Sequence, residues 1–140
     1  MDDQHLVFIT SCAAGDAGAV TAFNLDTGTG ALTQLNRCTD IGSPFFIALS
    51  PDRKFLYSTH AADDFEGASG YVAAFEIVGT SGELRKLNEQ PANGLTTCYV
   101  DVAPTGKAVV FANYSSGSVG SYPVGADGSL GEMASFIQHD

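Results

Sequence analysis

Apolar residues in this chain occur in short runs separated by glycine-rich and polar turns, and the clearest case is a hairpin at 98–114. One apolar run meets the turn Pro104-Thr105-Gly106, and a second apolar run follows. Proline presets φ at the second position of a turn and glycine accepts positive φ, so the pattern predicts two strands joined by a reversal. The same pattern occurs at 45–60, where Pro51 precedes Pro104 by 53 residues.

The segments between these hairpins also repeat. A predicted strand at 6–11 is followed by a pair of segments at 18–36 around a glycine-containing turn, and a similar pair follows at 70–88. An offset of 52 residues aligns Gly18 with Gly70, Val20 with Val72, Phe23 with Phe75, Leu32 with Leu84 and Asn36 with Asn88. A third copy, with a shorter connection, occupies 117–133. The chain is therefore built from a repeated unit.

Each full unit is predicted to contain four strands. These lie at 45–50, 55–60, 71–77 and 84–89 in one unit, and at 98–103, 108–113, 119–124 and 130–137 in the next. Four short antiparallel strands in a repeat of about 40–50 residues are typical of a propeller blade. We therefore predict an all-β, partial β-propeller of about three blades, with a flat sandwich as the alternative.

The blade boundaries follow from the repeat. The first blade, at 6–38, lacks its inner strand, the second covers 45–89 and the third covers 98–137. Because a propeller typically closes with four to eight blades, three blades cannot form a ring. We expect further blades to be needed for ring closure, and the opposite terminus to supply the missing inner strand so that no sheet edge remains bare.

Composition excludes several function classes. The 140 residues are 44% apolar without a sustained helical period, as expected for one all-β domain with a core. The net charge of −10 disfavours nucleic acid and anionic lipid as partners. Because no apolar run approaches membrane-spanning length and no charged-then-apolar pattern follows Met1, membrane spanning and secretion are not expected. Three cysteines without CxxC spacing are consistent with reduced thiols and a cytoplasmic location.

Several motifs resemble the N-terminal third of the lactonase-type seven-bladed β-propellers, a family that includes bacterial 6-phosphogluconolactonase and fungal carboxymuconate cyclase. The residues that carry the resemblance are at 26–33, 43–52, 112–119, 126–132 and 138–139, and the Asn-Tyr-x-Ser-Gly-Ser-Val block at 113–119 is the most specific. Two positions depart from the family, since Tyr99 replaces a usual histidine and His60 replaces a frequent asparagine.

This resemblance implies hydrolysis of a sugar lactone, typically 6-phosphogluconolactone to 6-phosphogluconate, within carbohydrate metabolism and the pentose phosphate pathway. It implies no cofactor. The family's His-x-His segment and its later arginine and glutamate residues would lie beyond Asp140, so this chain by itself is expected to be inactive. The resemblance makes His139 the catalytic candidate within the chain, and it makes Asn113 and Tyr114 pocket residues.

Topology adds further candidates, because the ends of second strands and the starts of first strands meet on one face of a propeller. That face is expected to gather Ser43, Phe45, Asp63 and Asp64 together with the substrate-binding candidates Asn113, Tyr114, Tyr99 and His60. Each has a structural alternative: a turn-capping amide, a packed loop aromatic, a tyrosine at the edge of the core and a satisfied histidine.

Metal and phosphate sites are not expected. The acidic loop at 63–66 lacks a calcium-loop framework, and the three histidines lack zinc spacing. The six basic residues fall at turns or on outer strands, so they are expected to be solvated surface charges. Besides the lactonase, two functions stay open: a non-catalytic propeller that binds a ligand or protein, and a short protein that completes its ring by oligomerisation.

Overall fold

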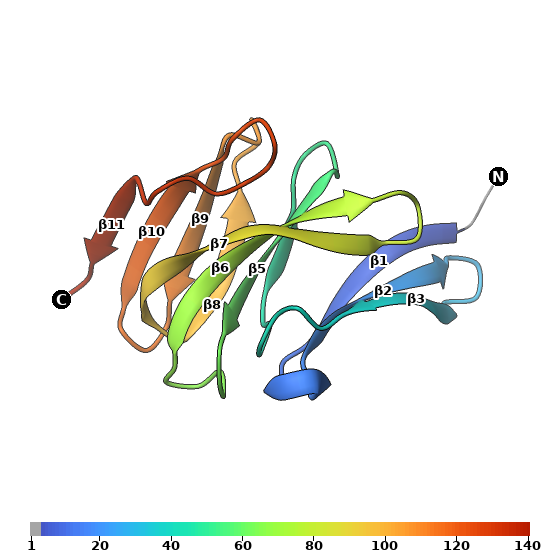
Figure 1. The fold of residues 1–140 in the computed structure, drawn as a ribbon, viewed down its shortest axis with the longest axis horizontal. Helices are drawn as coiled ribbons and strands as arrows, with labels where there is room; N and C mark the ends of the chain where they lie inside the picture. Colours follow the sequence, from blue (N-terminus) through green and yellow to red (C-terminus); the bar gives the residue numbers. More distant parts are fainter. Residues whose placement is uncertain (1–3) are drawn as a thin grey trace.

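The computed structural model describes residues 4–140, which form three antiparallel sheets in chain order (Figure 1). The first sheet has the order β1-β2-β3. Its strands are β1 (Gln4–Ser11), β2 (Ala19–Asp26) and β3 (Leu32–Cys38), and the short 3-10 helix η1 (Gly15–Ala17) lies between β1 and β2. An inner strand beside β1 is thus not found within residues 4–140.

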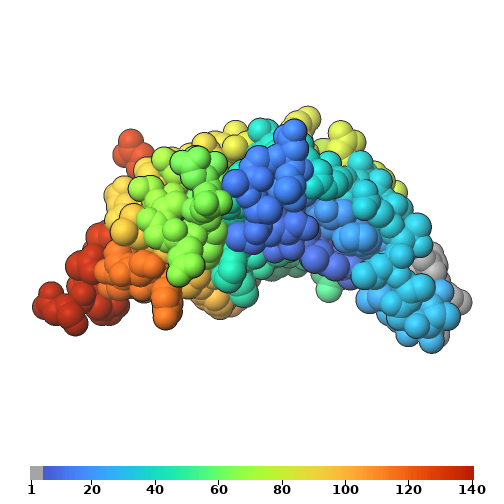
Figure 2. Space-filling view, turned by 90° about the horizontal axis from the view of Figure 1, so that it is seen from below, coloured from blue at the N-terminus to red at the C-terminus, as the bar shows by residue number. Residues whose placement is uncertain are grey.

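The other two sheets each contain four strands in sequential order. The second sheet consists of β4 (Ile47–Leu49), β5 (Phe55–Ala61), β6 (Ser69–Val78) and β7 (Glu83–Leu95). The third sheet consists of β8 (Thr97–Val102), β9 (Ala108–Asn113), β10 (Ser118–Pro123) and β11 (Ser135–Gln138). Viewed from below, the sheets form an arch with the first and third sheets at its two ends (Figure 2).

Both predicted proline turns are present. In the first turn, Asp52 accepts hydrogen bonds from the Ser50 hydroxyl at 2.6 Å and from the Lys54 amide at 3.0 Å. The Phe55 amide donates to Ser50 Oγ, which ties the strand after the turn to the residue before it. In the second turn Gly106 has a φ of 72°, a conformation that glycine adopts without a Cβ clash. Local turn chemistry therefore sets both hairpins.

Two apolar clusters join the sheets. One lies between the second and third sheets and includes Tyr57, Val72, Val100, Phe111 and Tyr122. The other lies between the first and second sheets and includes Val20, Ile41, Leu56, Ala73 and Phe75. The second sheet consequently packs against a neighbouring sheet on each face and exposes Leu49 and Leu95. The first and third sheets keep further exposed apolar side chains, among them Ile9, Leu32, Val110 and Ile137.

Some predicted strand bounds were wrong. The strand expected at 130–137 is confined to β11, because Leu130 is buried against the second sheet and its backbone exchanges hydrogen bonds with the Asn88 side chain at 2.7 and 2.9 Å. The inner strand expected at 45–50 is reduced to β4. Among the described residues, no helix has the length and apolar character to cross a membrane.

Candidate functional site

The predicted site residues all lie at one end of the sheets. We call this end the candidate face and define it by the segments 12–18, 39–46, 62–68, 95–98 and 113–117, which hold the connections and the strand ends beside them. The antiparallel strand order places the two proline turns at the opposite end, since β5 runs from Phe55 at its turn to Ala61 at the candidate face. The topological prediction of one shared face is consistent with this arrangement.

Asn113 forms the centre of a buried hydrogen-bond network on this face. Its residue is 3% exposed, and its Nδ2 donates to Ala92 O and to Ser118 Oγ, both at 2.9 Å. Its Oδ1 accepts from the Thr97 hydroxyl at 2.6 Å. Because these bonds occupy the amide, Asn113 has the environment of a residue that holds the 113–117 turn, which is the structural alternative considered from the sequence.

Thr96 joins two of the loops at the candidate face. Its Oγ1 accepts from the Gly67 amide at 2.9 Å and lies 2.7 Å from Ser115 Oγ, while its carbonyl accepts from the Tyr114 amide at 2.8 Å. Thr96 has a φ of 56°, and Ser43, which precedes the inner strand of the second sheet, has a φ of 38°. Positive φ is costly for a β-branched residue, so the surrounding hydrogen bonds must hold Thr96 in place.

A groove of about 340 Å³ opens beside Thr96. Its lining consists of Phe45, Phe65, Glu66, Thr96, Cys98, Tyr114 and Ser115. The rings of Phe45 and Phe65 stack with their centroids 4.3 Å apart and their planes 10° apart. Tyr114 is 78% exposed, so its ring is available to a ligand rather than packed in a core. Of the sequence-predicted site residues, Tyr114 lines this groove.

His60 lies inside the protein near the end of β5. Its imidazole stacks on Tyr71 at 5.4 Å, and its Nε2 lies 2.7 Å from the Glu89 carboxylate. Although this distance is short, neither ring nitrogen of His60 has a hydrogen bond of good geometry, to Glu89 or to any other group in the described part of the chain. Burial lowers the pKa of His60, and the nearby Glu89 opposes this shift without cancelling it. His60 is therefore an inward-facing histidine whose burial disfavours the charged imidazolium.

The lowered pKa predicts a pH-dependent loss of stability. The unfolded chain binds a proton at His60 near pH 6.5, whereas the folded chain does so at a lower pH, so acidification through this window favours unfolding. We expect the stability advantage of the native chain over a His60→Gln variant to shrink between pH 7.5 and 5.5 in urea unfolding. An advantage that grows instead would mean that the ion pair with Glu89 outweighs burial.

Tyr99 and His139 lie outside the groove. Tyr99 belongs to β8, packs against Phe46 with ring centroids 4.9 Å apart, and lines a mainly apolar hollow of about 360 Å³ on the third sheet. His139 is exposed after β11, and its backbone amide donates to Gly117 O at 2.9 Å. The structure thus brings the candidates to one face without gathering them into one cavity.

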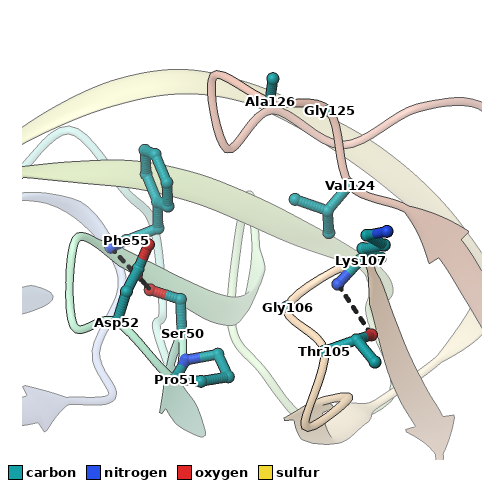
Figure 3. Close-up of a pocket in the computed structure, with 10 residues that line it drawn as sticks. All are labelled: Ser50, Pro51, Asp52, Phe55, Thr105, Gly106, Lys107, Val124, Gly125 and Ala126. Atoms are coloured by element: carbon teal, nitrogen blue, oxygen red, sulfur yellow. Dashed lines mark hydrogen bonds between the residues drawn. The ribbon is translucent and has the colours of Figure 1, made fainter.

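Another cavity, of about 410 Å³, lies at the opposite end between the two proline turns (Figure 3). Asp52 and Lys107 supply the charges of its lining, and the Lys107 amide donates to Thr105 Oγ1. Asp52 already accepts the Ser50 hydroxyl. Within residues 4–140 no cluster of three or more His, Cys, Asp or Glu residues could hold a metal ion.

Sequence reasoning missed Phe65 and Thr96 as parts of the site. Phe65 stands among Asp63, Asp64 and Glu66, which suggested a solvated acidic loop. Its stacking on Phe45 depends on a fold-back of the loop that no local pattern encodes. A lone aromatic residue in a polar loop was the one available signal, because such a residue gains stability by covering another apolar surface.

The chain is 34% identical to a 6-phosphogluconolactonase of Bacillus subtilis over 97% of its own length and 38% of that protein. It superposes on the crystal structure of a candidate 6-phosphogluconolactonase of Bacteroides fragilis with a TM-score of 0.85 and 28% identity, covering 99% of this chain and 37% of that one. A periplasmic gluconolactonase of Pseudomonas aeruginosa shares the fold, with a TM-score of 0.80, 22% identity and coverage of 97% and 38%.

The chain thus spans less than two fifths of the length of these relatives. Its three sheets correspond to part of a β-propeller, which confirms the predicted all-β partial propeller. The family model described as a lactonase with a seven-bladed β-propeller matches residues 6–140. The chain belongs to the seven-bladed β-propeller lactonase family.

Proposed function

We propose that this chain supplies the N-terminal blades of a sugar-lactone hydrolase that converts 6-phosphogluconolactone to 6-phosphogluconate. The proposal rests on its membership in the lactonase family, together with relatives named 6-phosphogluconolactonase. We call the chain joined to the blades that follow it in these relatives the complete propeller. The proposal includes blades at 6–38, 45–89 and 98–137, and the division of the chain into three sheets supports it.

Lactone opening requires a base that activates water and donors that stabilise the developing oxyanion. A phosphorylated substrate also requires Arg or Lys. The groove at the candidate face has no lysine or arginine among its described lining residues. We therefore assign the base, the oxyanion donors and the phosphate site mainly to later blades. Within this chain His139 remains the catalytic candidate, and Tyr114 is the substrate-binding candidate that lines the groove. Tyr99 and His60 could reach the substrate only from outside this groove, and Asn113 acts by holding Tyr114.

Ring closure explains two features of the arch. The exposed apolar faces of the first and third sheets would be covered by neighbouring blades. The unpaired edge of β1 borders a groove of about 260 Å³ lined by 6–8 and 47–49, which has the position of a missing inner strand between β1 and β4. We propose that a strand from the far end of the complete propeller pairs there.

The third sheet offers a test of this closure. Val110 is 45% exposed in the chain, so Val110→Asp is expected to change its stability little. In the complete propeller the same change would bury a carboxylate against the next blade and lower the free energy of unfolding by about 2–3 kcal/mol. Thr80→Asp, in the exposed β6–β7 turn, adds the same charge and serves as the control. Equal small effects of Val110→Asp in both proteins would contradict ring closure at this face.

The activity is tested by following acid release from 6-phosphogluconolactone, with the spontaneous rate subtracted. The complete propeller is expected to accelerate hydrolysis, and the 140-residue chain to leave the spontaneous rate unchanged. Turnover by the 140-residue chain that is lost on changing His139 would show that it holds its own catalytic set. Ligand binding by the complete propeller without turnover of any lactone would instead favour a non-catalytic binding module.

We further propose a cytoplasmic location, based on three cysteines that stay unpaired in the structure. The thiol of Cys12 is exposed, whereas Cys38 and Cys98 are partly buried. Fractionation of the source cells, with detection of the protein by antibody, checks this location. Recovery in a periplasmic or extracellular fraction would contradict it.

A further inference from the structure

We infer that the groove at the candidate face binds the hydroxylated ring of the sugar lactone and not its phosphate. This inference deepens the proposed function and rests on it. It assigns a substrate-binding role to Phe45, Phe65 and Glu66, and it orients the substrate, since the phosphate must then point away from this groove.

The stacked pair of Phe45 and Phe65 provides an aromatic surface at the groove. The two rings are nearly parallel, and Phe45 is still 43% exposed although it packs against Phe65. The face of an aromatic ring carries partial negative charge. The C–H bonds on the apolar side of a sugar ring carry partial positive charge and pack well on such a face. Tyr114, which is largely exposed in the same groove, adds a third ring.

The charges of the groove select the neutral part of the substrate. Glu66 is exposed in the lining, and an ionised carboxylate accepts hydrogen bonds from sugar hydroxyls. The same carboxylate repels a phosphate group, and the described lining offers no lysine or arginine to offset that repulsion. The combination of aromatic faces with one acceptor group therefore fits a hydroxylated ring and disfavours its phosphate.

The two sides of the groove are held in place before a ligand arrives. Thr96 connects the 62–68 loop, which carries Phe65 and Glu66, to the turn that carries Tyr114. It makes these contacts with a positive φ that its own side chain disfavours. A site whose walls are ordered in advance loses less conformational entropy on binding. The strain at Thr96 is thus consistent with a groove built to bind a ligand.

The test compares two lactones in the complete propeller: 6-phosphogluconolactone and gluconolactone, which lacks the phosphate. Phe65→Leu removes the ring and keeps an apolar side chain. We expect it to raise KM about five- to tenfold for both lactones while kcat changes less than twofold. Phe55→Leu, at the proline-turn cavity of Figure 3, is the matched control and is expected to leave both KM values unchanged. Thermal unfolding verifies that each variant is folded.

Glu66→Gln gives a second, independent readout. If the groove holds the hydroxylated ring, loss of the carboxylate raises KM for both lactones. If the groove holds the phosphate, the same change lowers KM for 6-phosphogluconolactone alone, and that result would overturn the inference. An unchanged KM in folded Phe65→Leu, with the native protein active, would overturn it while leaving the proposed function intact.

Binding measured without turnover separates the two proposals. Calorimetric titration with 1,5-anhydroglucitol and its 6-phosphate, which keep the closed hydroxylated ring but have no lactone bond to hydrolyse, is expected to show weaker binding of both to Phe65→Leu than to the native protein. If the native complete propeller hydrolyses neither lactone yet this difference appears, the proposed function fails and the groove assignment stands. If neither ring analogue binds the native protein, the groove assignment is overturned.

Discussion

Replacing Phe111 by alanine is expected to lower the free energy of unfolding of the complete propeller by about 3–5 kcal/mol. Phe111 is 2% exposed in the cluster between the second and third sheets, and its ring stacks on Tyr122 with centroids 4.9 Å apart. Gly120 lies against the ring so closely that a Cβ there would come within 2.3 Å of Phe111 Cζ. A backbone packed this tightly leaves little that can move in to fill the cavity.

Chemical unfolding in guanidinium chloride measures this effect, with Phe111→Leu as the control. Because leucine keeps most of the apolar volume, Phe111→Leu should lower the free energy of unfolding much less than Phe111→Ala does. A cost under about 1 kcal/mol for Phe111→Ala would contradict the tight packing between these two sheets. Equal costs for the two variants would locate the effect in the loss of ring stacking rather than in a cavity.

Replacing Asn113 by alanine is expected to lower the free energy of unfolding of the complete propeller by about 3 kcal/mol, because three buried polar groups lose their hydrogen-bond partner. The Thr97 hydroxyl loses its acceptor, and Ala92 O and Ser118 Oγ lose a donor. Thermal or urea unfolding of the complete propeller measures the loss. The control is Asn36→Ala, whose exposed amide bonds to Ser81, and its cost should remain below about 1 kcal/mol.

The same variant separates a structural role of Asn113 from contact with substrate. If Asn113 acts by holding the 113–117 turn, Asn113→Ala should raise KM together with the loss of stability, and a low assay temperature should restore part of the affinity. A fully stable Asn113→Ala protein with abolished turnover would contradict the structural role. It would return Asn113 to the set of residues that touch the substrate.

Local chemistry explains why both hairpins were predictable. Pro51 and Pro104 restrict φ, and the glycine or polar residues beside them accept the turn, so a few neighbouring residues suffice. The repeat of aromatic, valine and leucine positions likewise predicted the strand order of the sheets. The fate of Leu130 was not predictable, because the Asn88 side chain that captures its backbone lies in another sheet.

In the candidate site too, some features follow from neighbouring residues and others only from contacts between distant segments. A two-residue period can place His60 on one side of a strand, but the contacts with Tyr71 and Glu89 that make it an interior residue come from other strands. Asn113 and Tyr114 are adjacent in sequence, and the sequence predicts a substrate-binding role for both. The structure buries the first in a hydrogen-bond network and exposes the second at the groove.

From the sequence by itself, the all-β class, the repeated four-stranded unit and the need for further blades followed, because turn chemistry and strand periodicity act over a few residues and recur with each repeat. The tertiary structure decided which candidates are buried and which line a cavity, and it revealed the stacked pair of Phe45 and Phe65 beside Thr96. The physical reason is that burial, ring stacking and side-chain hydrogen bonds depend on segments that meet through the curvature of the sheets and the folding back of loops. No local pattern of residues records where those segments meet.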